Sequence, residues 1–346
     1  MIPAGKLATF AVLAVVNLAM LLIVVAVVEL SFGEWFRPYV PPAVAVMDRS
    51  HTYRQNLYEP HGDIRYVRDK YGLRGVHEPI SAVDVVTVGG STTDQRYIDE
   101  GQTWQDVMRQ SCGLHIANAG ADGMTSTGHV VAVDEWLHRI PDFRPKTFLH
   151  YIGVNDASAG VEPHESDLSG KHTPWLRDIR RRSIIAKGLE ALLATFSPPR
   201  EVAHGITVAP GVPSLRPVDA IPDSVVKYVQ AGYASNLRKL LDLHRSRRET
   251  AILISQPSHP SIVAKQDGVT WVSTAHPGLQ GWGVALHLIN RATATVCGEN
   301  PDVCRFSDAA ADVAFGPGDF YDLVHLTPSG ARKLGSYLCR TITATR

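Results

Sequence analysis

The sequence predicts an α/β protein in which helices cover both faces of a parallel sheet. From Val83 onward, strand-like and helix-like segments alternate, and the first strand-like run ends abruptly in Gly89 and Gly90. Such alternation is typical of parallel sheets joined by crossover helices. A third observation concerns the N-terminus, where an apolar run matches the ~20 residues that cross a bilayer. It predicts one transmembrane helix in front of the sheet domain.

The composition is that of an ordinary globular protein. The 346 residues are 45% hydrophobic and 20% charged, with a formal net charge of +0. A chain of this length forms one large domain with appendages or two small domains. Because neither a basic surface nor an acidic tail is indicated, no nucleic-acid partner is expected, and the sequence leaves protein partners unknown.

The N-terminal run predicts a membrane anchor. Residues 7–28 are apolar except at two positions; Lys6 precedes them, and Glu29 and Glu34 follow. The positive-inside tendency therefore places the N-terminus in the cytoplasm and the rest of the chain outside. A cleaved secretory signal is the alternative, but the run exceeds the usual ~7 to 15 residues and no Ala-x-Ala site follows it.

These signals divide the chain into three parts. We expect a transmembrane anchor at 1–30, a juxtamembrane linker and N-terminal extension at 31–80, and an α/β domain at 81–346 with an irregular insertion at about 157–223. Pro41-Pro42 predicts a stiff spacer in the linker. The basic run from Arg177 to Arg182 is most simply a solvated helix face, with contact to lipid head groups as the alternative.

Apolar runs and end signals order the elements of the α/β domain. Thr327 caps the last predicted helix, and Pro328 occupies its first turn. The predicted strands lie near 83–88, 114–118, 146–151 and 250–254, and the predicted helices near 103–111, 126–138, 175–195, 224–246, 281–296 and 328–341.

The four cysteines show neither a Cys-x-x-Cys pattern nor zinc-ligand spacing with histidines, so no metal site is predicted. Cys297 and Cys304 flank a short polar loop and form the expected disulfide if the compartment is oxidising. Closing a loop this short would stabilise the fold by roughly 2 to 3 kcal/mol in the entropic model.

Polar or glycine residues follow three predicted strands, and two more precede the last helix. Ser91, Gly123 and Asn155 follow the first, second and third strands, and Asp322 and His325 share a short loop. Because the carboxyl ends of parallel strands meet at one edge of a sheet, these groups can converge there.

Together these residues supply what acyl transfer requires. Ser91 is a weak nucleophile that needs a base; His325 can be that base, and Asp322 can orient its imidazole. The backbone N–H groups of Ser91 and Gly123 and the side-chain amide of Asn155 can donate to the oxyanion of a tetrahedral intermediate.

Each stretch also has a purely structural interpretation. Ser91 with its neighbours suits a helix cap, Asn155-Asp156 is a common turn pair, and Asp322-x-x-His325 suits a capping loop. His259, after the fourth strand, lines the site in one interpretation and is a surface-loop histidine in the simpler one. Only the joint order of the stretches favours catalysis.

Four stretches resemble, in order and spacing, the sequence blocks of the SGNH (GDSL-type) hydrolase superfamily. They are Gly-Gly-Ser-Thr at 89–92, Asn-Ala-Gly-Ala-Asp-Gly at 118–123, Gly-Val-Asn-Asp at 153–156 and Asp-Leu-Val-His at 322–325. One position departs, because Gly90 stands where the acidic residue of Gly-Asp-Ser is usual. That residue is outside the triad, and the variant is similar to a branch of membrane-anchored and exported bacterial members.

The resemblance covers about residues 83–340 and implies a flavodoxin-like three-layer α/β/α sandwich, serine esterase chemistry and no cofactor. It carries over Ser91, Asp322 and His325 as a catalytic triad. It also implies an oxyanion hole made by Ser91, Gly123 and Asn155.

We therefore expect an extracytoplasmic serine esterase anchored in a bacterial inner membrane, with its catalytic domain in the periplasm or outside the cell. The preferred substrate is an O-acetyl ester on a cell-surface or exopolysaccharide sugar. This preference rests on location and family analogy, because the fold does not fix the substrate. The alternatives are an O-acetyltransferase using the same acyl-enzyme, a lipid esterase or lysophospholipase, and a non-catalytic carbohydrate-binding scaffold.

Overall fold

The computed structural model describes residues 4–33, 35–36, 49–159, 182–195, 200–202, 215–218, 223–266, 268–273 and 280–343. It divides into two compact units, one made of Met1–Tyr39 with Lys171–Pro198 and the other of Val40–Gly170 with Pro199–Arg346. The predicted Pro41-Pro42 spacer, most of the basic run from Arg177 to Arg182 and much of the predicted insertion at 157–223 lie outside the described residues.

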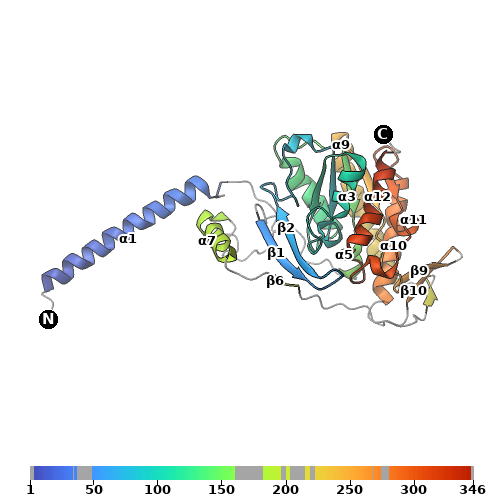
Figure 1. Ribbon diagram of the computed structural model, residues 1–346. Coiled ribbons are helices and arrows are strands. Elements are labelled where there is room, and N and C mark those ends of the chain that lie inside the picture. Colours follow the sequence, from blue (N-terminus) through green and yellow to red (C-terminus); the bar gives the residue numbers. More distant parts are fainter. Residues whose placement is uncertain are drawn as a thin grey trace. The chain divides into compact units, whose positions relative to one another are not determined.

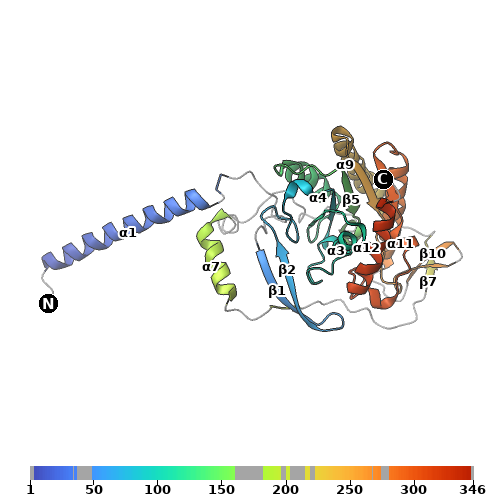
Figure 2. The same ribbon diagram turned by 45° about the horizontal axis from the view of Figure 1, so that its top comes forward.

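The smaller unit contains two helices, α1 (Ala4–Phe32) and α7 (Ile184–Thr195). Within α1, the segment Val12–Phe32 has a mean hydropathy of 2.7, and none of it is buried. It is long and apolar enough to cross a membrane. Although about 150 residues separate them in sequence, α7 lies beside the C-terminal end of α1 in two views (Figures 1 and 2).

The larger unit is built on a five-stranded parallel sheet with the strand order β11-β8-β5-β3-β4. In chain order this is the 2-1-3-4-5 arrangement of flavodoxin-like folds, so the predicted α/β/α sandwich is confirmed. The strands are β3 (Val85–Gly89), β4 (Ile116–Gly120), β5 (Thr147–Tyr151), β8 (Thr250–Ile254) and β11 (Cys304–Ser307).

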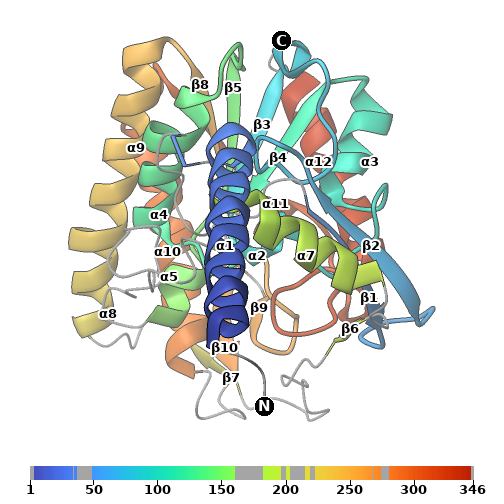
Figure 3. The ribbon, with the colours of Figure 1, turned by 90° about the vertical axis from the view of Figure 1, so that its left-hand side faces the viewer.

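Helices cover both faces of this sheet (Figure 3). The longer ones are α3 (Trp104–Cys112), α9 (Ala234–Arg247), α10 (Gln280–Gly298) and α12 (Pro328–Thr343). The shorter ones are α2 (Ser91–Asp94), α4 (Ser126–Val131), α5 (Val154–Ala159), α8 (Asp223–Tyr228) and α11 (Ala309–Asp312). Single 3₁₀ or π turns are η1 (Ile80–Ala82), η2 (Ala132–Trp136), η3 (Leu137–Arg139), η4 (Val229–Tyr233) and η6 (Pro317–Asp319).

The alternation of side chains along β3 explains why the sheet has a core on each face. Val85 packs in the cluster that contains Trp104 of α3 and Leu334 of α12, whereas Val86 packs in the cluster that contains Leu237 of α9. Successive strand residues point to opposite faces, so an uninterrupted apolar strand needs cover on both.

The N-terminal extension forms a hairpin that the sequence did not reveal. Strands β1 (Arg49–Gln55) and β2 (Gly62–Arg68) pair antiparallel, and the short β6 (Arg200–Glu201) pairs with β1. Downstream of β2, Arg74 forms bridges both to Arg68 and to Asn118 of β4. The hairpin was missed because its strands are rich in charged residues.

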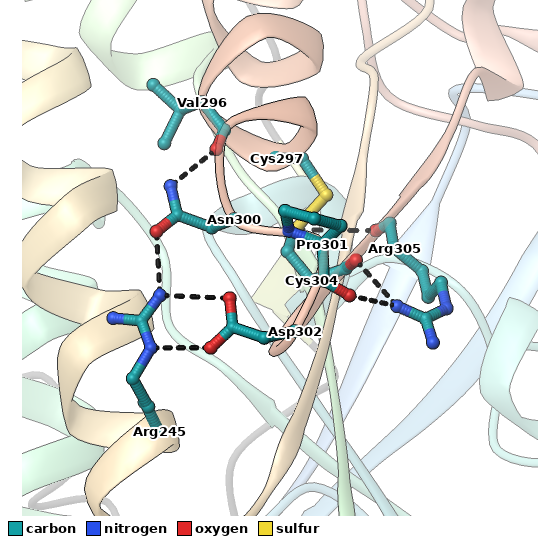
Figure 4. Close-up of a disulfide and its surroundings, with 8 residues drawn as sticks. All are labelled: Arg245, Val296, Cys297, Asn300, Pro301, Asp302, Cys304 and Arg305. Carbon is teal, nitrogen blue, oxygen red and sulfur yellow. Dashed lines mark hydrogen bonds and ion pairs between the residues drawn. A yellow bond between two sulfur atoms is a disulfide. The ribbon is translucent and has the colours of Figure 1, made fainter.

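A second small sheet and two disulfides complete the larger unit. Strands β7 (Leu215–Pro217), β9 (Val263–Gln266) and β10 (Val269–Ser273) form the small sheet. The expected Cys297–Cys304 bridge is present, between the end of α10 and the start of β11 (Figure 4). A second bridge, Cys112–Cys339, joins α3 to α12 and was not predicted, because 227 residues separate its cysteines.

Candidate active site

The turn after β3 presents Ser91 at the carboxyl edge of the sheet. All five residues of β3 are buried, and α2 begins immediately after Gly90. A Cβ atom on Gly89 would lie 1.8 Å from Thr93 Oγ1, and one on Gly90 would lie 2.4 Å from Asn155 Nδ2. The two glycines therefore allow a turn so tight that α2 and Asn155 pack directly against its backbone.

The structure brings Ser91, His325 and Asp322 together. His325 Nε2 lies 2.7 Å from Ser91 Oγ, and His325 Nδ1 lies 2.6 Å from Asp322 Oδ2. Both separations are hydrogen-bond distances, and 234 residues separate the serine from the histidine. The arrangement has the order of contacts found in a nucleophile, base and orienting carboxylate.

Asp322 is held as a buried carboxylate. It is 2% exposed, and its Oδ1 accepts hydrogen bonds from the backbone N–H groups of Val324 and His325, at 2.9 and 2.7 Å. Burial by itself raises the pKa of Asp322, but the hydrogen bonds and charge of His325 and these N–H groups outweigh it and lower the pKa to about 2. The side chain is therefore ionised at neutral pH and able to stabilise an imidazolium.

The imidazole of His325 is accessible but fixed in orientation. Its side chain is 19% exposed. The ring of Tyr321 stacks on it with the centroids 5.4 Å apart and an angle of 7° between the planes. The backbone N–H of His259 donates to Leu323 O at 2.7 Å, while the imidazole of His259 contacts Ser261. His259 thus supports the loop that carries the imidazole through its backbone.

The sequence assigned three N–H donors to an oxyanion hole: the backbone N–H groups of Ser91 and Gly123 and the side-chain amide of Asn155, which lies against Gly90. Asn155 Nδ2 donates to Met124 O at 2.9 Å, which uses one of its two hydrogens. Gly123 is exposed, with a φ of +78° that favours glycine. Within the described part of the chain, the backbone N–H groups of Ser91 and Gly123 have no protein acceptor. These groups are available to a bound oxyanion.

Asp156 connects the loop after Gly123 to the helix that carries Asn155, a role that the sequence did not indicate. Its carboxylate accepts hydrogen bonds from Ser126 N at 2.9 Å, Ser126 Oγ at 2.6 Å and Tyr228 Oη at 3.1 Å. It thereby ties the loop that follows Gly123 to the start of α5, where Asn155 lies.

Side chains of the N-terminal extension support α2, the short helix that begins at Ser91. Arg68 Nη2 lies 2.7 Å from Asp94 Oδ1 and 2.5 Å from Gly120 O, and Tyr66 Oη donates to the same carboxylate oxygen at 2.9 Å. Arg74 donates to the carbonyls of Asp94 and Gln95 at the end of α2. Both arginines are buried. The only sequence signal for this role was two arginines close upstream of the first predicted strand.

One further group of ligand-type side chains lies away from Ser91. Among the described residues, His138, His244 and Glu249 are the group whose side-chain atoms lie close enough to hold a metal ion. The ring of His138 lies 5.8 Å from that of Phe148 at the start of β5, and Glu249 directly precedes β8, so both lie near the amino-terminal ends of strands, opposite the edge that carries Ser91. Glu249 Oε2 already contacts His138 Nε2 at 3.1 Å and His244 Nδ1 at 2.8 Å.

Comparison with known proteins gives similarities in fold. No family model and no curated protein matches the chain. A member of the lipolytic protein G-D-S-L family from Veillonella parvula is 12% identical with a TM-score of 0.43, covering 76% of this chain and 99% of its own. A GDSL-like lipase from Bacteroides thetaiotaomicron is 12% identical with a TM-score of 0.42, covering 78% and 93%.

A catalytic variant of an acetylxylan esterase from Geobacillus stearothermophilus is 14% identical with a TM-score of 0.43, covering 75% of this chain and 93% of its own. At such identities the likeness concerns the fold alone. Any conclusion about chemistry therefore depends on the residues around Ser91.

Proposed function

We propose that the chain is a membrane-anchored serine esterase of the SGNH type that hydrolyses O-acyl esters. The observation that carries this proposal is the continuous contact from Ser91 Oγ to His325 Nε2, at 2.7 Å, and from His325 Nδ1 to Asp322 Oδ2, at 2.6 Å. It occurs at the carboxyl edge of a parallel sheet, and the backbone N–H groups of Ser91 and Gly123 have no acceptor among the residues that the structure describes. A serine without such a neighbour would be a weak nucleophile at neutral pH.

The reaction follows from this geometry. Ser91 Oγ attacks the ester carbonyl carbon while its proton passes to His325 Nε2, and the negative oxygen is stabilised by the N–H groups of Ser91, Gly123 and Asn155. The intermediate collapses, and the alcohol leaves with the proton from His325. Water then attacks the acyl-enzyme and gives a proton to the same nitrogen. The bond between Ser91 Oγ and the acyl carbon breaks, His325 returns the proton to Ser91 Oγ, and the acid is released. Asp322 stays ionised throughout and stabilises the imidazolium.

The preferred substrate is an O-acetyl ester on a cell-surface or exopolysaccharide sugar, and the support is location. The apolar segment Val12–Phe32 anchors the chain in this proposal, and Lys6 before it orients the following unit away from the cytoplasm. Two disulfides suit an oxidising compartment such as the periplasm. An enzyme tethered there meets the polymers of the cell surface.

Intact-mass analysis tests the chemistry. The full chain in detergent micelles is incubated with p-nitrophenyl acetate and longer acyl esters, with Ser91→Ala as the control. We expect a Ser91-dependent acyl adduct, p-nitrophenol release and a preference for short chains. Turnover that persists in Ser91→Ala would overturn the assignment of the nucleophile, and a preference for long chains would favour a lipid substrate.

Reporter fusions test the orientation separately. A phosphatase reporter that is active only outside the cytoplasm is fused after Arg346, and we expect it to be active. Activity of a cytoplasmic reporter at the same position would reverse the proposed orientation while leaving the chemistry of the site untouched.

A further inference from the structure

Helix α7 carries an apolar face that lies open in the structure. Ile185, Leu189 and Leu192 are 43%, 55% and 58% exposed. At 3.6 residues per turn, positions separated by three or four residues share one side of a helix, so these side chains form a single stripe. A stripe of this kind on a helix of twelve residues requires a covering surface, because apolar side chains in water cost free energy in proportion to their area.

The start of α7 is attached to the end of α1. Glu29 Oε1, on α1, accepts a hydrogen bond from Ser183 Oγ at 2.6 Å and one from the backbone N–H of Ile185 at 3.1 Å. A carboxylate at this position satisfies an N–H group that the helix itself leaves unpaired and favours the positive end of the helix. Glu29 Oε2 accepts a third bond, from Trp35 Nε1 at 2.9 Å.

The length of the apolar segment in α1 determines how deep in the membrane Glu29 would lie. Val12–Phe32 contains 21 residues, and at 1.5 Å per residue it spans roughly 30 Å, which is the thickness of the hydrocarbon core. Glu29 lies in the last turn of that segment and therefore at the boundary between hydrocarbon and water. Trp35 suits this depth, since tryptophan favours the interface.

We propose that α7 lies in the plane of the membrane interface, with the stripe of Ile185, Leu189 and Leu192 facing the acyl chains. The inference rests on the proposed insertion of α1, and it commits to one occupant, the lipid bilayer. Because Glu29 holds the start of α7 at the boundary, the open stripe begins at the depth where lipid is the nearest apolar phase. Arg182 Nη1 donates to Trp35 O at 3.2 Å, which ties a basic residue to the same boundary.

Lys187 provides a matched control on the same helix. Two residues correspond to about 200° of rotation, so Lys187 and Leu189 lie on nearly opposite sides of α7. An apolar stripe with a basic residue on the opposite side is the pattern of interfacial helices. The same depth of insertion at both positions would be incompatible with a helix lying in the interface plane.

The test uses the cysteine chemistry of the chain. All four native cysteines are in disulfides, so Leu189→Cys, Lys187→Cys and Leu22→Cys each introduce a single free thiol into the full chain. Each variant is labelled with an environment-sensitive fluorophore and reconstituted in phosphatidylcholine and phosphatidylglycerol vesicles. The vesicles carry nitroxide quenchers either near the head group or deep in the acyl chains.

We expect the label at position 22 to be quenched by the deep nitroxide, the label at 189 to be blue-shifted and quenched by the shallow one, and the label at 187 to be quenched by neither. If position 22 is quenched and position 189 is not, α7 is covered by protein, a second copy included, and the proposal is wrong. Equal quenching at 187 and 189 would also overturn it. An unquenched position 22 overturns the premise of an inserted α1, and with it the proposal. Ester turnover, measured in the same vesicles, reports on the active site independently.

Discussion

The larger unit contains two sets of side chains in which a histidine lies between a carboxylate and a further polar group. At the carboxyl edge of the sheet, His325 contacts Asp322 and Ser91 at 2.6 and 2.7 Å. On α9, His244 contacts Glu249 through Nδ1 and His150 through Nε2, both at 2.8 Å. Hydrogen-bond distances alone do not separate the candidate active site from the second cluster.

Solvent access does separate them. The side chain of His325 is 19% exposed, whereas that of His244 is 0% exposed. Burial lowers the pKa of His244, even though Glu249 opposes the shift, and burial with the neighbouring His244 and His129 lowers the pKa of His150 well below its usual range. A general base must be reached by substrate and must gain a proton, and burial prevents both.

The contacts of the buried cluster are consistent with neutral imidazoles. Glu249 Oε2 can accept N–H bonds from His138 Nε2 and His244 Nδ1, and His244 Nε2 is then free to accept from His150. In this arrangement the carboxylate is the one charged group, and two N–H bonds compensate its burial. We infer that this cluster fixes α9 and the strands beneath it, whereas the chemistry stays at the carboxyl edge.

Asp322→Asn, a substitution in the candidate active site, should have the largest effect on ester turnover of the variants proposed here. An amide at this position favours the wrong imidazole tautomer, and we expect kcat to fall about 10⁴-fold, equivalent to about 5.5 kcal/mol. The measurement is p-nitrophenyl ester turnover by the full chain. A loss of less than tenfold would contradict the proposed role of Asp322.

Asn155→Ala should have the next largest effect. Removing one oxyanion donor typically lowers kcat about 10²- to 10³-fold. Gly90→Ala is a matched variant, because its Cβ would lie 2.4 Å from Asn155 Nδ2 and must displace that amide. Steady-state kinetics should show both variants losing kcat with little change in KM. Full activity in both would remove Asn155 from the proposed oxyanion hole.

Glu249→Gln tests the role of the buried cluster in stability, with ester turnover as the control. The substitution removes the charge that accepts two imidazole N–H bonds, and we expect the free energy of unfolding to fall by about 1.5 to 3 kcal/mol. Denaturant unfolding at pH 7 measures this loss, and ester turnover of the folded variant should equal that of the unmodified chain. Reduced kcat with unchanged stability would show that the two clusters are coupled.

The sequence predicted the parts of the molecule that depend on local signals. The apolar runs located β3, β4, β5 and β8, and four short stretches singled out Ser91, Gly123, Asn155, Asp322 and His325. Of these, the structure places Ser91, His325 and Asp322 in contact and Asn155 against the neighbouring Gly90. The hairpin β1–β2 was missed because its strands carry charges that usually indicate a loop. The support of α2 by Arg68 and Arg74 and the buried histidine cluster were missed because their contacts join residues far apart in the chain, which periodicity cannot reveal.

The pH dependence of stability provides a further test of the difference between accessible and buried histidines. Burial lowers the pKa of His129 to about 3, and its ring centroid lies 6.2 Å from that of His150. Because the folded pKa lies below the unfolded value of about 6.5, the unfolded chain binds more protons below pH 6.5. The contribution of His129 is therefore complete above about pH 6.5 and decreases by about 1.4 kcal/mol for each pH unit down to about pH 3.

His129→Gln removes this contribution and leaves the contacts of Asp322 and His325 intact. Unfolding free energies measured at pH 7, 6 and 5 should therefore decrease less steeply with acidification in the variant than in the unmodified chain. The lowered pKa of Asp322 adds a separate loss only as the pH falls from about 4 toward 2, so it does not affect this comparison. Parallel slopes in the two proteins would mean that His129 is not held neutral by burial, and the contrast between the buried and the accessible histidines would lose its physical basis.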